Sequence, residues 1–164
     1  MPDPDLKAPL AETVYDPVAC VARECAATRD FIDVLEREQY ALQQADVSLL
    51  LALEKEKVQQ AQQLSQLTDA RNRWLAKLGY AQDRTGMERG LKIFPAATDA
   101  WQKLLRLAET ASQLNKINGV LIGQRLRYNQ QALAVLQAAT HGTGLYGSDG
   151  QPRLFSIGRP LGEG

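Results

Sequence analysis

Few side chains in this chain of 164 residues have the types and spacing that chemistry requires. The single histidine, His141, ends a long helical pattern, where we expect it to cap the helix. No glycine-rich loop leads into a Lys-Ser or Lys-Thr pair, no Glu-x-x-His pair occurs, and no Ser or Cys has a plausible base. We therefore expect a protein that is not an enzyme and binds no cofactor.

The two cysteines, Cys20 and Cys25, are five residues apart. On a helix they would point in different directions, too far apart at Cα to form a disulfide. No other Cys or His stands near them to complete a metal site. We expect both to be small core residues and predict no metal site.

One enzymatic alternative uses polar residues on helical seams. All-helical chorismate mutases bind a dianionic substrate with arginines and amides that project inward, and Arg71, Asn118 and Arg125 could imitate that arrangement. A polar interruption of a coiled-coil seam more often fixes register or lines a water-filled gap. This alternative therefore ranks below a binding function.

The charge balance argues against large classes of partner. Nineteen basic and nineteen acidic residues cancel, and no run of like charge stands out, so we expect neither nucleic-acid binding nor an anionic membrane partner. The N-terminus lacks a basic start followed by an apolar core, and the longest aliphatic run covers only residues 49–53. We expect a cytoplasmic protein without stable membrane insertion.

Two helices are predicted in the first half. Asp16 and Pro17 supply an N-cap and a first-turn proline, and Asp46 marks a bend, so the pattern predicts helices over residues 17–44 and 47–78. The spacing alone leaves open a hairpin or one kinked helix at Asp46, and we favour the hairpin. The apolar face of the first comprises Val21, Cys25, Thr28, Phe31, Leu35 and Leu42. The seam of the second comprises Val47, Leu50, Ala61, Leu64, Leu75 and Leu78.

Residues 79–97 are expected to form a connector with at most one helical turn around residues 87–91, followed by a long helix over residues 98–141. Two neighbouring seams at three- and four-residue steps run through this helix in phase. One begins Trp101, Leu104, Ala108, Ala111, Asn115, and the other Leu104, Leu107, Ala111, Leu114, Asn118. The resulting face is wide, apolar at both ends and polar in its middle.

Gly119 and Gly123 lie one turn apart inside this long helix, where each costs about 1 kcal/mol relative to Ala. They could let another backbone come close, or they could make an ordinary contact within the bundle. The sequence leaves both interpretations open.

The fold class that follows is all-α: an antiparallel bundle of three long helices with coiled-coil character and a flexible C-terminal tail. We expect a disordered lead-in over residues 1–16, a helical domain over 17–141 and the tail over 142–164, which holds seven of the twelve glycines. The tail also carries apolar side chains that could form a recognition segment or pin it to the bundle: Leu145, Tyr146, Leu154, Phe155 and Ile157.

Three short segments resemble one family. Residues 114–122 (LNKINGVLI), residues 129–133 (NQQAL) and, after the helix, residues 145–151 (LYGSDGQ) are similar in order and spacing to FlgN, the cytoplasmic chaperone family of flagellar type III export. The resemblance covers roughly residues 110–151, while the earlier helices are similar only in character.

The resemblance implies that the chain binds terminal helices of the hook-filament junction proteins FlgK and FlgL and delivers them to the export gate protein FlhA. It places gate binding on Tyr146. A client helix laid on the wide face of the long helix would be helix-in-groove recognition. The candidate client-binding residues are Leu114, Asn118, Leu121, Ile122, Arg125, Tyr128, Ala132, Val135 and Leu136.

A self-associating coiled-coil scaffold is the second binding hypothesis. The spare face of the long helix would then pair with the same face of another copy. Both hypotheses would hold if the free protein forms a homodimer and a client then displaces one of the two copies.

Overall fold

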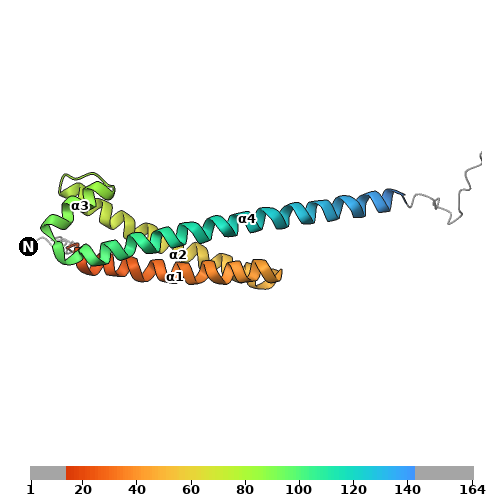
Figure 1. Cartoon of the computed structure of the whole chain (residues 1–164), viewed down its shortest axis with the longest axis horizontal. Coiled ribbons are helices and arrows are strands. Elements are labelled where there is room, and N and C mark those ends of the chain that lie inside the picture. Colours follow the sequence, from red (N-terminus) through yellow and green to blue (C-terminus); the bar gives the residue numbers. More distant parts are fainter. Residues whose placement is uncertain (1–13, 143–164) are drawn as a thin grey trace, which may run out of the picture. The chain divides into compact units, whose positions relative to one another are not determined.

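A computed structural model of the whole chain describes residues 14–142, with side chains up to residue 140 (Figure 1). Every regular element in this range is helical, which confirms the predicted all-α class. The elements are α1 (Pro17–Gln44), α2 (Val47–Lys77), α3 (Arg84–Ile93), a 3-10 turn η1 (Pro95–Ala97) and α4 (Thr98–Gly142). The predictions for the lead-in before residue 14 and for the tail after residue 142 fall outside the described residues.

α1 and α2 form a hairpin whose turn is set by local caps (Figure 1). Asp16 begins α1 by accepting a hydrogen bond from Val18 N at 3.1 Å, with Pro17 in the first turn. Ala45 then adopts a left-handed conformation (φ 59°), and Asp46 starts α2 by accepting from Leu49 N at 3.0 Å. The predicted break at Asp46 is therefore a two-residue turn.

α3 shows that the predicted count of three helices is incomplete. The connector holds a ten-residue helix, which Asp83 caps by accepting a hydrogen bond from Gly86 N at 2.8 Å. Met87 and Leu91 of α3 are buried in the main core. The other buried members of this core come from α1, α2, η1 and the start of α4: Val21, Cys25, Trp74, Leu75, Ala97, Trp101 and Leu104.

The chain separates into two compact units, with the boundary inside α4 between Leu121 and Ile122. The first unit contains the helical hairpin, α3 and residues 98–121 of α4, and the described part of the second is the rest of α4. None of the helices in residues 14–142 combines the length and apolar character that a membrane span requires.

Ion pairs and hydrogen bonds connect α1 to α2 along the hairpin. Glu24 pairs with Arg71 near one end, and Glu38 pairs with Lys57 (2.9 Å) nearer the turn. A second, smaller core of Val34, Ala41 and Leu53 lies in the same hairpin. The hairpin is therefore held by alternating apolar and charged contacts, which suits helices rich in Glu and Gln.

Candidate partner-binding surface

The nine predicted client-binding residues differ widely in exposure. In the first unit Asn118 is fully buried, and Leu114 and Leu121 are half-buried. In the second unit Arg125 is half-buried. The exposed members all belong to the second unit: Ile122, Tyr128, Ala132, Val135 and Leu136.

Asn118 faces its own chain. Its Nδ2 donates to the backbone oxygen of Leu35 and to Glu38 Oε2, both at 2.8 Å, and Glu38 also accepts hydrogen bonds from Lys57 Nζ. Its Oδ1 has no hydrogen-bond partner among the described residues. The side chain of Asn118 is thus inaccessible in this structure, and its expected role as a client contact stays a prediction. Its hydrogen bonds fix the register of α4 against α1, as polar residues in coiled-coil seams do.

Large apolar side chains of α4 are exposed throughout the second unit. Tyr128 is 72% exposed, Val135 68% and Leu136 62%. Sequence reasoning missed two further members, Leu126 and Leu133, each 57% exposed. Their signal was present, since Leu126 follows Ile122 by four residues and Leu133 follows Leu126 by seven.

Among the described residues of this unit, six large apolar side chains are exposed, and we call them the distal apolar face. They are Ile122, Leu126, Tyr128, Leu133, Val135 and Leu136. An amphipathic helix with such a face is typical of helix-in-groove or coiled-coil recognition, because water is unfavourable against so many aliphatic groups.

The two glycines inside α4 have open surroundings. A Cβ built on Gly119 or Gly123 would meet no atom within 4 Å, apart from the helix's own nearby backbone, in the part of the chain that the structure describes. The interpretation as an ordinary contact within the bundle is therefore wrong for these residues. A close approach by another chain remains a prediction.

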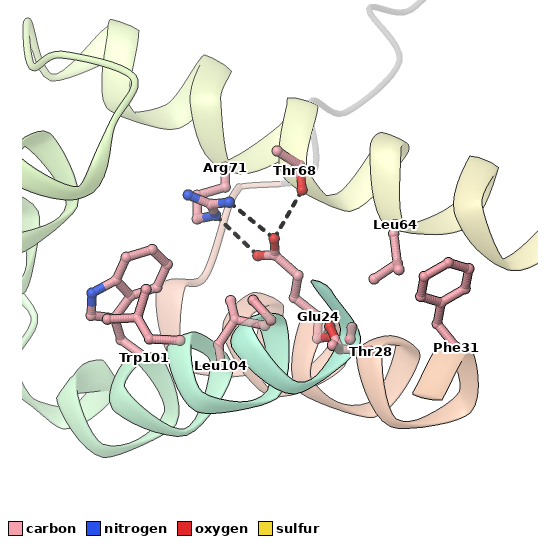
Figure 2. A pocket seen from close by; sticks show the side chains of 11 residues that line it. Glu24, Thr28, Phe31, Leu64, Thr68, Arg71, Trp101 and Leu104 are labelled. Atoms are coloured by element: carbon pink, nitrogen blue, oxygen red, sulfur yellow. Dashed lines mark hydrogen bonds and ion pairs between the residues drawn. The ribbon is translucent and has the colours of Figure 1, made fainter. Parts of the chain in front are cut away.

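A pocket of about 310 Å³ lies in the first unit, lined by residues of α1, α2 and the start of α4 (Figure 2). Arg71 Nε lies 3.0 Å from Glu24 Oε2, and Thr68 Oγ1 donates to Glu24 Oε1, also at 3.0 Å. The guanidinium lies 5.0 Å from the ring centre of Trp101. The remaining lining residues are Thr28, Phe31, Leu64, Leu104, Leu105, Ala108 and Ala111.

The charges of this pocket disfavour the chorismate mutase alternative. Glu24 and Arg71 are its charged lining residues, and each neutralises the other. A dianionic substrate would meet the Glu24 carboxylate and would have to displace it from Arg71. The ion pair therefore acts as a structural contact, and Asn118, the second residue of that alternative, is engaged by Leu35 and Glu38.

The two cysteines lie in different surroundings, and neither belongs to a group of metal-binding side chains among the described residues. Cys25 is buried, its Sγ lies 3.3 Å from the backbone oxygen of Ala100, and burial raises the pKa of its thiol. Cys20 is half-buried and accepts a hydrogen bond from Arg23. Within residues 14–140, no group of three or more His, Cys, Asp or Glu side chains could hold a metal ion.

Comparisons with known proteins point in one direction. The model of the family described as FlgN protein matches residues 15–153. The flagella synthesis protein FlgN of Yersinia enterocolitica is 38% identical over 107 residues, covering 60% of this chain and 72% of the relative. The protein of that name from Proteus mirabilis is 32% identical over 106 residues, with the same coverage. The one from Escherichia coli is 26% identical over 126 residues, covering 77% and 82%. No solved structure matches the chain.

Proposed function

The chain belongs to the FlgN family, and from this membership we propose that it is a cytoplasmic export chaperone acting in flagella synthesis. Its clients would be the terminal helices of FlgK and FlgL, and it would deliver them to the export gate protein FlhA. No enzymatic step is part of this function.

The observation that carries the proposal is the exposure of the distal apolar face. Fully covering one large aliphatic side chain contributes about 1.5–3 kcal/mol, so a client helix that covers several of the six gains a substantial share of its binding free energy there. Ordering the client and losing its rigid-body freedom offset part of that gain. A binding free energy reduced in this way suits a complex that must form before export and dissociate at the gate.

The first unit would serve as the platform for this face. We propose that α1, α2 and residues 98–121 of α4 form the predicted three-helix antiparallel bundle, to which α3 is an addition. The buried side chains of Trp101, Leu104 and Asn118 support this arrangement, since all three lie on the inner side of α4. Such a platform would fix the rotation of α4 about its axis.

The test of client binding compares two leucines of nearly equal exposure. Leu136→Asp changes a residue of the distal apolar face, while Leu51→Asp is the matched control on α2, where Leu51 is 66% exposed. We expect Leu136→Asp to weaken the binding of purified FlgK and FlgL by at least roughly 30-fold in isothermal titration calorimetry, equivalent to about 2 kcal/mol. The Leu51 variant should bind like the unmodified chain, and both should keep their helical circular dichroism. Equal losses in the two variants would contradict the assignment of the client to α4.

Gate binding is a separate part of the proposal. Tyr146 lies outside the described residues, and its role is carried by the family resemblance. Tyr146→Ala should leave client affinity unchanged and reduce binding to FlhA and export of FlgK. A loss of client affinity in this variant would show that the two activities are not divided in this way.

The self-associating scaffold uses the same exposed face and is the second candidate. Light scattering with and without FlgK distinguishes the two functions. A chaperone forms a complex with FlgK, whereas a scaffold keeps its own oligomeric mass and ignores the added protein.

A further inference from the structure

Four residues of the distal apolar face form one stripe along α4. They are Ile122, Leu126, Leu133 and Leu136, spaced by four, seven and three residues. At about 100° of rotation per residue, these spacings keep all four side chains within roughly 80° of one another around the helix axis. Each of the four is at least 45% exposed, so the stripe offers a continuous apolar surface over about four helical turns.

The sequence after α4 contains a short apolar segment. Leu154, Phe155 and Ile157 stand between two prolines, outside the described residues. Proline disfavours helical backbone at the residue before it, and so few residues between two prolines cannot form a stable helix, so we expect an extended segment. The match to the family model ends at residue 153, so family membership assigns no role to these side chains.

The spacing of this segment fits the spacing of the stripe. In an extended chain Phe155 and Ile157 point to the same side, about 6.6 Å apart at roughly 3.3 Å per residue. Ile122 and Leu126 are separated by about 6 Å along the axis of α4, at 1.5 Å per residue. Two side chains of the segment can therefore contact two successive turns of the stripe.

The tail is long enough to bring the segment to the stripe. Leu136 and Ile122 lie 6 and 20 residues before Gly142, the last residue of α4, which is about 9 Å and 30 Å along the helix axis. Residues 143–154 can span up to about 40 Å, which leaves enough chain for a reversal of direction. Four glycines from residue 142 to residue 150 suit such a reversal, because glycine adopts turn conformations without steric cost.

We propose that the apolar segment of the tail folds back onto this stripe of its own chain, with Phe155 packed against Leu126 and Ile157 against Ile122. Removal of apolar surface from water on both sides drives the contact. The covalent tether holds the segment at an effective concentration of about 1 mM, so that even a weak contact is populated. The segment then shields part of the distal apolar face while no client is bound. The consequence for the client rests on the proposed chaperone function: a client helix that covers this stripe must displace the segment.

Amide NMR spectra of the full chain test the contact with substitutions at adjacent tail positions. Phe155→Asp removes the aromatic side chain and adds a charge, whereas Ser156→Asp, the matched control, adds the same charge on the opposite side of an extended segment. We expect Phe155→Asp to shift the amide resonances of residues 122–136 and Ser156→Asp to leave them unchanged. Leu126→Asp should in turn shift the resonances of residues 154–157. Unchanged resonances of residues 122–136 in Phe155→Asp would overturn the proposal.

Light scattering distinguishes the chain's own tail from the tail of a second copy. We expect a monomeric mass, and resonances that do not change on dilution. A dimeric mass that is lost in Phe155→Asp would identify the second copy's tail as the occupant and overturn the contact within one chain.

Calorimetry with FlgK separates this inference from the proposed function. A segment docked in about half to four-fifths of the molecules lowers the apparent client affinity about two- to fivefold. Phe155→Asp should therefore tighten the binding of FlgK by that factor, and Ser156→Asp should not. Equal affinities in the two variants would contradict the shielding of the client site. If FlgK does not bind at all, the proposed function fails, while the NMR comparison still decides whether the tail contacts α4.

Discussion

Asn118 offers the sharpest test of how α4 is held. The side chain is fully buried, and its amide nitrogen joins α4 to α1 through the Leu35 backbone oxygen and the Glu38 carboxylate. Asn118→Ala removes both hydrogen bonds and leaves a small cavity. We expect this substitution to lower the free energy of unfolding.

The magnitude follows from four contributions, one of which opposes the other three. The hydrogen bond to the neutral Leu35 oxygen contributes about 1 kcal/mol, and the one to the charged Glu38 carboxylate about 1.5–3 kcal/mol. The buried Oδ1 of Asn118, which has no hydrogen-bond partner among the described residues, offsets about 1–3 kcal/mol of that. The truncation itself costs about 1 kcal/mol through lost packing. We expect a net loss of about 2 kcal/mol, which corresponds to a decrease in Tm of roughly 4–8 °C for a chain of this size.

Urea unfolding followed by circular dichroism measures this loss, and Asn115→Ala is the matched control. Asn115 lies one turn earlier on α4 and is exposed, so its substitution should change the free energy of unfolding by less than about 0.5 kcal/mol. A double-mutant cycle with Glu38→Gln should show a coupling of about 1 kcal/mol with Asn118→Ala. Equal losses for the two asparagines, or additivity in the cycle, would refute the reasoning.

Two further predictions concern the first unit. Glu24→Gln should lower the free energy of unfolding by about 3 kcal/mol in urea titrations, because it leaves the guanidinium of Arg71, whose side chain is only 12% exposed, without its counter-charge. Replacing both residues by apolar ones should recover most of that loss. Gly90→Ala should destabilise by about 1–2 kcal/mol, since the new Cβ would lie 2.8 Å from Cη2 of the buried Trp74, whereas Gly119→Ala in open space should stabilise by about 1 kcal/mol. The measurement is Tm, which should fall for Gly90→Ala and rise for Gly119→Ala. Equal shifts in the two variants would contradict this prediction.

The face of α1 could be predicted from the sequence because its signal is local. Five of the six residues expected on its apolar face are buried, and Phe31 is half-buried. An N-cap, a first-turn proline and a regular apolar spacing all favour the same helix. The buried face of such a helix can be predicted without knowing which helix packs against it.

The seam of α2 could be predicted only in part. Leu75 is buried as expected, but Val47 is 65% exposed, and the buried Leu53 and Trp74 were not on the predicted seam. The reason is that Trp74 packs against Gly90 of α3, a helix that its own glycines, Gly86 and Gly90, made hard to predict. The burial of α2 thus depends on contacts with a segment interpreted as a loop.

The hydrogen-bond partners of Asn118 could not be predicted from the sequence for a similar reason. Its hydrogen bonds reach residues 80 and 83 positions away, and no local pattern indicates which of two in-phase seams of α4 turns inward. In the first unit the second seam turns inward, since its Leu107 and Leu114 are half-buried, whereas Ala108 and Asn115 of the first seam are exposed. Which seam turns inward thus depends on the position of α1 beside α4, which the spacing within α4 alone does not indicate.

The same helix carries one apolar spacing through two environments, and this difference is the physical basis of the proposed function. Leu104 and Ala111 are buried, whereas Tyr128 and Leu136, on the continuation of the same steps, are mostly exposed. The packing of the core does not explain why the apolar spacing continues into the exposed part of α4. Exposed aliphatic side chains contribute nothing to folding until something covers them. A partner helix that covers them extends the packing that the chain's own helices begin.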